Sequence, residues 1–177
     1  MDERAYKLYE KCECMSLLCA KACSRWSLIK FIFQIPLILT SSVMCILNSF
    51  DNGDFSMKIP NVIVNGISVL LISYQNNLKV AEKTELFKNL SNQFLQLAHE
   101  VEGCEPEKLD RQRVNTLIEK YDALIQSCLF EDIPKSIKQE VVNIFEGKAL
   151  PLQLNGGSGL YSKNKKEIKA DVELVIA

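Results

Sequence analysis

Four cysteines fall within twelve residues near the start of the chain, in the stretch KCECMSLLCAKACSRW: Cys12, Cys14, Cys19 and Cys23. Thiolates at this density can hold a metal ion, form disulfides or accept acyl chains, whereas protonated thiols pack as small apolar side chains. Which chemistry applies depends on the secondary structure of the segment and on its compartment. Both follow from the elements around it.

The cysteine segment is predicted to be helical, because apolar residues recur at spacings of three and four over residues 2–26. On that helix Cys12, Cys19 and Cys23 lie within about 40° of one another, and Cys14 points to the opposite side. Zinc requires ligands that converge tetrahedrally, which one continuous helix cannot arrange with these four. We therefore expect no metal site, and packing as small hydrophobes is the favoured interpretation. Reversible acylation of Cys19 and Cys23 is the alternative, and Cys14 has no assigned role.

Two long stretches without any charged residue dominate the chain, 31–50 and 59–78, each of 20 residues. A bilayer core of about 30 Å needs roughly 20 helical residues. The stretches are predicted to be transmembrane helices joined by a short connection, in which Asn52-Gly53 is a turn signal. Two buried helices of a soluble bundle are the alternative.

Basic residues gather on one side of this predicted hairpin. Those before the first span and after the second are Lys11, Lys21, Arg25, Lys30, Lys79, Lys83 and Lys88. The connection between the spans offers only Lys58, against Asp51 and Asp54. Because cytoplasmic flanks carry the excess of Lys and Arg, both termini are predicted to be cytoplasmic. A reducing cytoplasm disfavours a disulfide framework.

Polar residues share one face of each predicted span. They are Gln34, Ser41, Cys45 and Asn48 in the first span and Asn61, Asn65, Ser68 and Gln75 in the second. Polar groups that face lipid cost free energy, so these residues are expected to face protein or water. Hydrogen-bonded contact between helices is the favoured interpretation, and a water-filled pathway lined by several subunits is the alternative.

The region after the second span is predicted to form cytoplasmic helices. No Gly or Pro interrupts residues 67–102, so we expect one unbroken helix from Pro60 to Glu102. Its apolar residues keep a three-four spacing that suits either packing within one subunit or a coiled coil: Phe87, Leu90, Phe94, Leu97 and Val101. A second helix is expected over residues 107–128, and a short third helix begins at Ile133-Pro134 and stops at Gly147.

The predicted fold is therefore all-α, with an amphipathic juxtamembrane helix (1–26), a two-span transmembrane hairpin (27–80), a cytoplasmic helical bundle continuing from the second span (81–147) and a flexible basic tail (148–177). The tail begins near a Gly-rich linker and ends in an alternating pattern. Val172, Leu174 and Ile176 are predicted to dock as a strand on another protein's sheet edge. A disordered tail is the alternative.

Most residue patterns that enzymes use are missing from the sequence. There is a single histidine, His99, and neither a phosphate-binding loop nor a paired-histidine zinc motif. A net charge of −1 leaves no overall electrostatic footprint for nucleic acid. We expect a non-enzymatic membrane protein without cofactor or metal, forming a homo-oligomer and binding no nucleic acid.

Three stretches carry a resemblance to a known family: PLILTSSVMCIL in the first span, VIVNGISVLLISYQNNLKVAEKTELFKNLSNQFLQL from the second span onward, and LIEKYDALIQSCLFEDIPKSIKQEVVNIF. Over roughly residues 5–147 the chain resembles the SLATT-type small two-span membrane proteins. In pattern it is most similar to versions encoded by large cytoplasmic DNA viruses.

The resemblance implies two functions of different class. The viral versions imply a structural protein in the inner membrane of a virion, a minor capsid component that ties the bilayer to the capsid shell. Its cytoplasmic helices and tail would contact other capsid proteins. The bacterial members imply the alternative, an oligomeric pore-forming membrane effector.

Overall fold

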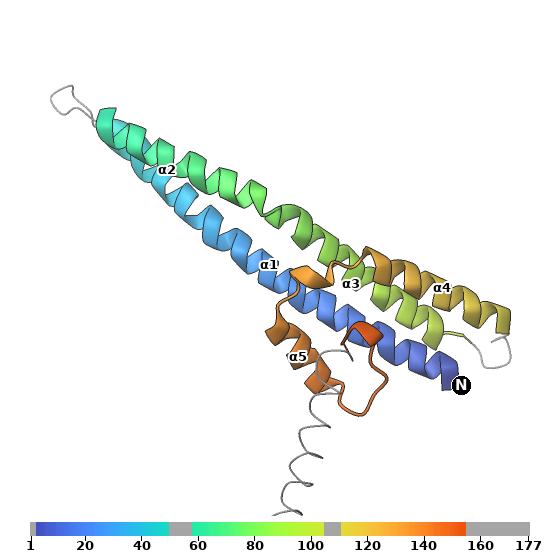
Figure 1. Cartoon of the computed structure of the whole chain (residues 1–177). Helices are drawn as coiled ribbons and strands as arrows, with labels where there is room; N and C mark the ends of the chain where they lie inside the picture. Colours follow the sequence, from blue (N-terminus) through green and yellow to red (C-terminus); the bar gives the residue numbers. More distant parts are fainter. Residues whose placement is uncertain (1–2, 50–57, 105–110, 155–177) are drawn as a thin grey trace, which may run out of the picture. The chain divides into compact units, whose positions relative to one another are not determined.

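The computed structural model describes residues 3–49, 58–104 and 111–154, and all secondary structure in these ranges is helical, which confirms the all-α class. The helices are α1 (Glu3–Ser49), α2 (Lys58–Asn77), α3 (Val80–Glu102), α4 (Arg111–Ser127), the 3₁₀ helix η2 (Phe130–Asp132) and α5 (Lys135–Ile144) (Figure 1). The chain divides into a bundle unit, Met1–Ala22 with Phe87–Ala177, and a helix-pair unit, Cys23–Leu86.

Helix α1 joins the predicted amphipathic helix and the predicted first span into a single element of 47 residues. No glycine occurs within it, and its one proline, Pro36, lies inside the helix. Proline lacks an N–H and removes one backbone hydrogen bond from the helix. The Thr40 hydroxyl donates to the carbonyl oxygens of Pro36 (2.8 Å) and Leu37 (3.1 Å), so its own hydrogen bond is satisfied within this turn.

The core of the bundle unit lies along the predicted apolar face of α3, whose five residues Phe87, Leu90, Phe94, Leu97 and Val101 are all buried. The Phe94 ring meets the Tyr121 ring of α4 edge-on, with centroids 5.9 Å apart. Ser16 and Ser91 exchange hydroxyl-to-carbonyl hydrogen bonds of 3.0 Å between α1 and α3. The heptad-like face is therefore used for packing within one chain.

Helix α1 is buried on two faces within the bundle unit. The predicted face includes Cys12 and Cys19, and a second face at spacings of four contains Glu10, Cys14 and Leu18. The second face meets the C-terminal part of the bundle, where Lys21 pairs with Glu140 of α5 at 2.8 Å. The burial of Cys14, which the sequence left unexplained, follows from this second face.

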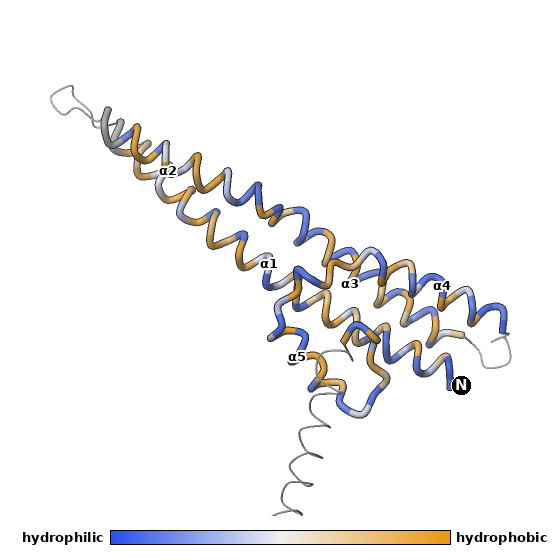
Figure 2. Tube along the Cα trace, in the orientation of Figure 1, coloured by the Kyte–Doolittle hydropathy of each residue, from blue (hydrophilic) through white to orange (hydrophobic). Residues whose placement is uncertain are grey.

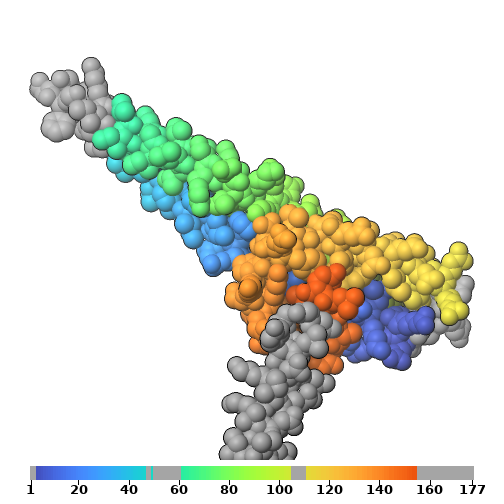
Figure 3. Space-filling model, viewed as in Figure 1, coloured from blue at the N-terminus to red at the C-terminus, as the bar shows by residue number. Residues whose placement is uncertain are grey.

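The segment after α5 packs against α1. Helix α5 ends at Ile144, three residues before the predicted stop at Gly147, and Gly147 adopts a left-handed φ of 86°, which glycine tolerates. The backbone N–H of Ala149 donates to Glu10 Oε2 at 2.9 Å, and Pro151 and Leu154 are buried. Figure 3 shows α5 and residues 148–154 lying against α1. The packed region thus extends past the predicted boundary at Gly147.

The expectation of one unbroken helix from Pro60 to Glu102 is wrong at Leu78 and Lys79, which separate α2 from α3. Lys79 has a positive φ of 51°, a left-handed conformation that costs an L-residue with a Cβ about 1–2 kcal/mol. The N–H of Leu78 still bonds to Tyr74 O at 3.1 Å, but that of Lys79 bonds to Asn76 O at 3.0 Å, one residue closer than in an α-helix. No glycine or proline marks the break in the sequence.

Candidate functional site

Large apolar side chains cover the outside of the helix-pair unit. Hydrophobic colours predominate along α2 and the neighbouring part of α1 in Figure 2. The exposed residues, each 46–72% accessible, are Phe31, Ile32, Ile35, Ile38, Leu39, Val43, Ile46, Val62, Ile63, Ile67, Val69, Leu70, Ile72 and Tyr74. We call this set the apolar belt.

An apolar belt of fourteen exposed side chains is unusual for a surface in contact with water. Burying one such side chain stabilises a protein by about 1.5–3 kcal/mol, and soluble monomers rarely expose a continuous apolar patch of this kind. Among the described residues one helix, α1 over Glu3–Ile46, is long and apolar enough to cross a membrane, and its most apolar stretch contains no buried residue. A buried helix of a soluble core would have that stretch covered.

The two helices of this unit contact each other along one face each. The rings of Phe33 and Tyr74 contact each other at a tilt of 55°, with centroids 5.7 Å apart. The half-buried residues recur at helical spacing and define the seam: Phe33, Gln34, Leu37, Thr40 and Met44 on α1, and Asn61, Val64, Ser68, Leu71 and Gln75 on α2. Because the helices run antiparallel (Figure 1), each step along α1 matches a step back along α2.

This register places six of the eight predicted polar residues at three levels. Gln34 and Gln75 follow Phe33 and Tyr74 directly, so they lie within about 3 Å of each other along the axis. Ser41 lies seven residues after Gln34 on α1, and Ser68 lies seven residues before Gln75 on α2. These two serines therefore share the next level. One more heptad brings Asn48 level with Asn61. Spans that associate through polar groups need partners at matching levels, and the sequence spacing supplies them.

The predicted polar residues divide by exposure. Gln34, Asn61, Ser68 and Gln75 are half-buried in the seam, whereas Ser41, Cys45 and Asn65 are exposed beside it. The side chain of Asn48 lies outside the described part of the structure. A Cβ added to Gly66 would meet no atom within 4 Å, so no part of the described chain approaches this glycine closely.

Four cysteines of the bundle unit are buried: Cys12, Cys14, Cys19 and Cys128. Burial raises the pKa of the Cys12 and Cys14 thiols to about 12. A hydrogen bond between Cys19 and Cys128 raises the pKa of Cys19 and lowers that of Cys128. Neutral buried thiols act as small apolar groups in a core.

The predicted acylation sites differ in access. Cys19 is fully buried, so an acyl chain reaches it only if the unit opens, whereas Cys23 is half-buried. Within the described ranges no three His, Cys, Asp or Glu side chains are grouped so as to hold a metal ion. The predicted docking residues Val172, Leu174 and Ile176 lie outside the described residues.

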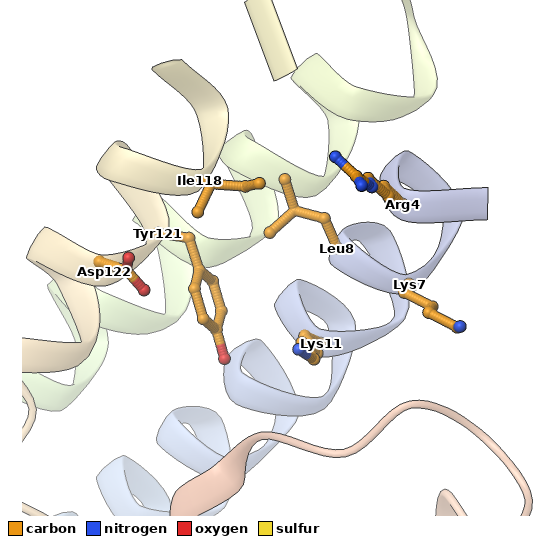
Figure 4. Close-up of a pocket in the computed structure, with 7 residues that line it drawn as sticks. All are labelled: Arg4, Lys7, Leu8, Lys11, Ile118, Tyr121 and Asp122. Carbon is orange, nitrogen blue, oxygen red and sulfur yellow. The ribbon is translucent and has the colours of Figure 1, made fainter. Parts of the chain in front are cut away.

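A small open pocket of about 250 Å³ lies between α1 and α4 in the bundle unit (Figure 4). Its lining consists of Arg4, Lys7, Leu8, Lys11, Ile118, Tyr121 and Asp122. The buried Tyr121 hydroxyl has no hydrogen-bond partner among the described residues. Lys7 pairs with Glu3, however, and Asp122 adds a negative charge at the wall. Ligand pockets usually measure about 300–1,000 Å³, so this hollow is small for a ligand site.

Comparison of the chain with protein-family models, with curated proteins and with solved structures finds no match. The apolar belt, the seam and the charges around them are the features of the chain that bear on its function.

Proposed function

We propose that the protein is an integral membrane protein whose helix-pair unit crosses a bilayer twice. The observation that carries this proposal is the apolar belt, which is exposed on both α1 and α2. In a bilayer these side chains lie against lipid tails, and the half-buried polar groups of the seam face the other helix. Each uncharged stretch has 20 residues, the length that a 30 Å core requires.

Both termini lie on the cytoplasmic side in this proposal. The excess of Lys and Arg flanks the outer ends of the two spans, and the connection between them carries two aspartates and one lysine. The bundle unit is built from the segments before the first span and after the second. It therefore forms a single cytoplasmic body attached to the membrane by two helices.

The role of this body is structural attachment. Apart from Glu10, the buried residues of its core are apolar, and its Cys12 and Cys14 thiols stay protonated well above neutral pH because burial raises the pKa of each to about 12. In keeping with the resemblance to viral SLATT-type proteins, the protein anchors an inner viral membrane to its capsid shell as a minor capsid component. The bundle unit and the chain beyond it contact the shell.

Membrane insertion is tested by placing a charge in the middle of the apolar belt. Ile38→Lys and Leu70→Lys should each shift the protein from the carbonate-resistant membrane fraction to the soluble or aggregated fraction, because a central lysine costs about 2.5–3.5 kcal/mol on insertion. The matched control is Leu152→Lys, which changes an exposed leucine of the bundle unit. Carbonate release of the unaltered protein would refute the proposal.

The anchoring role is tested with particles stripped of lipid by detergent. The full chain should stay with the shell, and deletion of residues 155–177 should release it if the tail is the attachment. The deletion should begin after Leu154, because the buried Pro151 and Leu154 belong to the packed bundle. Loss of the intact protein together with the lipid would refute anchoring. Retention of the truncated chain would place the attachment on the bundle unit.

A specific observation favours a second candidate, the oligomeric pore. Ser41, Cys45 and Asn65 are exposed beside the seam, where a monomer would present them to lipid. Several copies could turn these groups toward a shared water-filled path. The pore predicts leakage from dye-filled liposomes that Ser41→Leu or Asn65→Leu abolishes, with Val69→Leu as the control on the belt. Intact liposomes at high protein loading would eliminate this candidate.

A further inference from the structure

At the end of the helix-pair unit that holds the break after α2, a cation–aromatic contact joins α1 to the first turn of α3. Lys83 Nζ lies 4.6 Å from the centroid of the Trp26 ring. Tryptophan favours the interface between lipid and water, and a cation over its face is attracted by the ring. The contact therefore places an aromatic ring and a positive charge at the same height along the helix axes of the helix-pair unit.

Three more cations lie within about a turn of this level. Lys30 is one turn further along α1 than Trp26, and Lys79 is one turn before Lys83. In the antiparallel register these two lysines face the same level, and Arg25 adjoins Trp26. We call Arg25, Lys30, Lys79 and Lys83, with Trp26 among them, the basic collar.

The acidic groups of this part of the unit do not balance the basic collar. They are Glu82 and Glu85, against four cations. Lys79 pairs with Glu82 at 3.7 Å, but both side chains are about two-thirds or more exposed, and exposed pairs contribute little. Lys30 and Lys79 carry like charges at one level, and an anion between them would relieve their repulsion.

The basic collar has the thickness of a lipid headgroup layer. From Arg25 to Lys30 the helix rises about 7.5 Å, and the headgroup region on each side of a bilayer core is about 5–8 Å thick. The apolar belt begins at the next residues, Phe31 and Ile32. Cations at this depth meet phosphates rather than tails or bulk water.

We infer that the basic collar binds the headgroups of anionic phospholipids, with lysines of both helices around one phosphate and Trp26 beside it. The inference rests on the proposed two-span insertion. It assigns the helix-pair unit a preference for anionic over zwitterionic lipid, a property that insertion alone does not require. Each Lys or Arg near an anionic membrane surface adds about 1 kcal/mol of attraction, equivalent to roughly fivefold in affinity.

The test uses the full chain reconstituted into vesicles of phosphatidylcholine, alone or mixed with phosphatidylserine. Energy transfer from Trp26 to headgroup-labelled lipid reports which lipid surrounds the protein. Labelled phosphatidylserine should be enriched over labelled phosphatidylcholine, and the Lys30→Gln/Lys79→Gln variant should lose that enrichment by about fivefold to 25-fold. Raising the salt concentration should weaken it in the unaltered protein.

The matched control is Arg113→Gln/Lys135→Gln, which removes two charges from exposed positions of the bundle unit. It should keep the enrichment, since those residues lie outside the collar. Equal energy transfer from both lipids, with the protein inserted in pure phosphatidylcholine, would overturn the inference and leave the two-span proposal intact. Failure to insert into either vesicle would refute the two-span proposal and the inference with it.

Discussion

The carboxylate of Glu10 accepts a hydrogen bond of 2.9 Å from the backbone N–H of Ala149, across 139 residues of sequence. Glu10 is the one buried charged residue among the described residues. The bond fixes the chain after α5 to the second buried face of α1. Lys148 supports the same junction, with its Nζ 3.8 Å from Glu13 Oε2 and 5.1 Å from the Phe145 ring centroid.

Glu10→Ala should destabilise the bundle unit by about 1.5–3 kcal/mol, because the partly buried backbone N–H of Ala149 loses a charged acceptor. Denaturant unfolding in detergent would measure the loss, and limited proteolysis should cut sooner near Ala149. Glu146→Ala is the control, since Glu146 is exposed. If the two variants unfold alike, the Glu10–Ala149 bond contributes nothing to stability.

Lys79→Gly should stabilise the break between α2 and α3. Glycine adopts a φ of 51° without the Cβ penalty, whereas Lys79→Ala keeps the penalty and removes the same charge. The glycine variant should exceed the alanine variant in unfolding free energy by about 1 kcal/mol. A glycine variant less stable than the alanine variant would mean that the positive φ is not kept in solution.

The face of α3 could be predicted because its apolar residues follow a local spacing that packing then uses. Phe87, Phe94 and Val101 are buried where the period places them. The break at Lys79 could not be predicted, since neither glycine nor proline marks it. Asn76-Asn77 was the only local sign of a turn.

The second buried face of α1 escaped prediction for a different reason. Glu10, Cys14 and Leu18 recur at spacings of four, but a glutamate within the set indicates a solvent-exposed face. The partners that cover this face, Ala149 and Glu140, come more than a hundred residues later. The sequence likewise predicted that polar residues share one face of each span. Which residue of one span lies level with which residue of the other became clear only from the antiparallel register.

Gln34 and Gln75 should be energetically coupled through the seam. A double-mutant cycle with Gln34→Leu and Gln75→Leu, measured by unfolding in bicelles, should give a coupling of about 0.6 kcal/mol and at most about 1.7 kcal/mol. The matched cycle pairs Gln34→Leu with Asn65→Leu. Asn65 lies at another level, so this cycle should show no coupling energy. Equal coupling in both cycles would contradict the register.

The buried thiols give the bundle unit a stability that depends on alkaline pH. Burial raises the pKa of Cys12 and Cys14 from 9.0 to about 12, so the folded state holds their protons more tightly than the unfolded state does. The contribution of these two thiols to the free energy of unfolding is complete below about pH 9, and it is lost as the pH rises towards about 12. For each unit by which burial raises a thiol's pKa, the folded state loses at most about 1.4 kcal/mol of stability once the pH exceeds the folded-state pKa.

Cys14→Ala should therefore flatten the fall of unfolding free energy above about pH 9, while lowering stability at neutral pH because it leaves a cavity. Chemical unfolding followed by circular dichroism at a series of alkaline pH values would measure the slope of unfolding free energy against pH. Other titrating groups contribute equally to this slope in the variant and in the unaltered protein. Ser127→Ala, at an exposed residue whose side chain does not titrate, should keep the slope of the unaltered chain. A slope unchanged in Cys14→Ala would show that the Cys14 thiol ionises as readily in the folded protein as in the unfolded one.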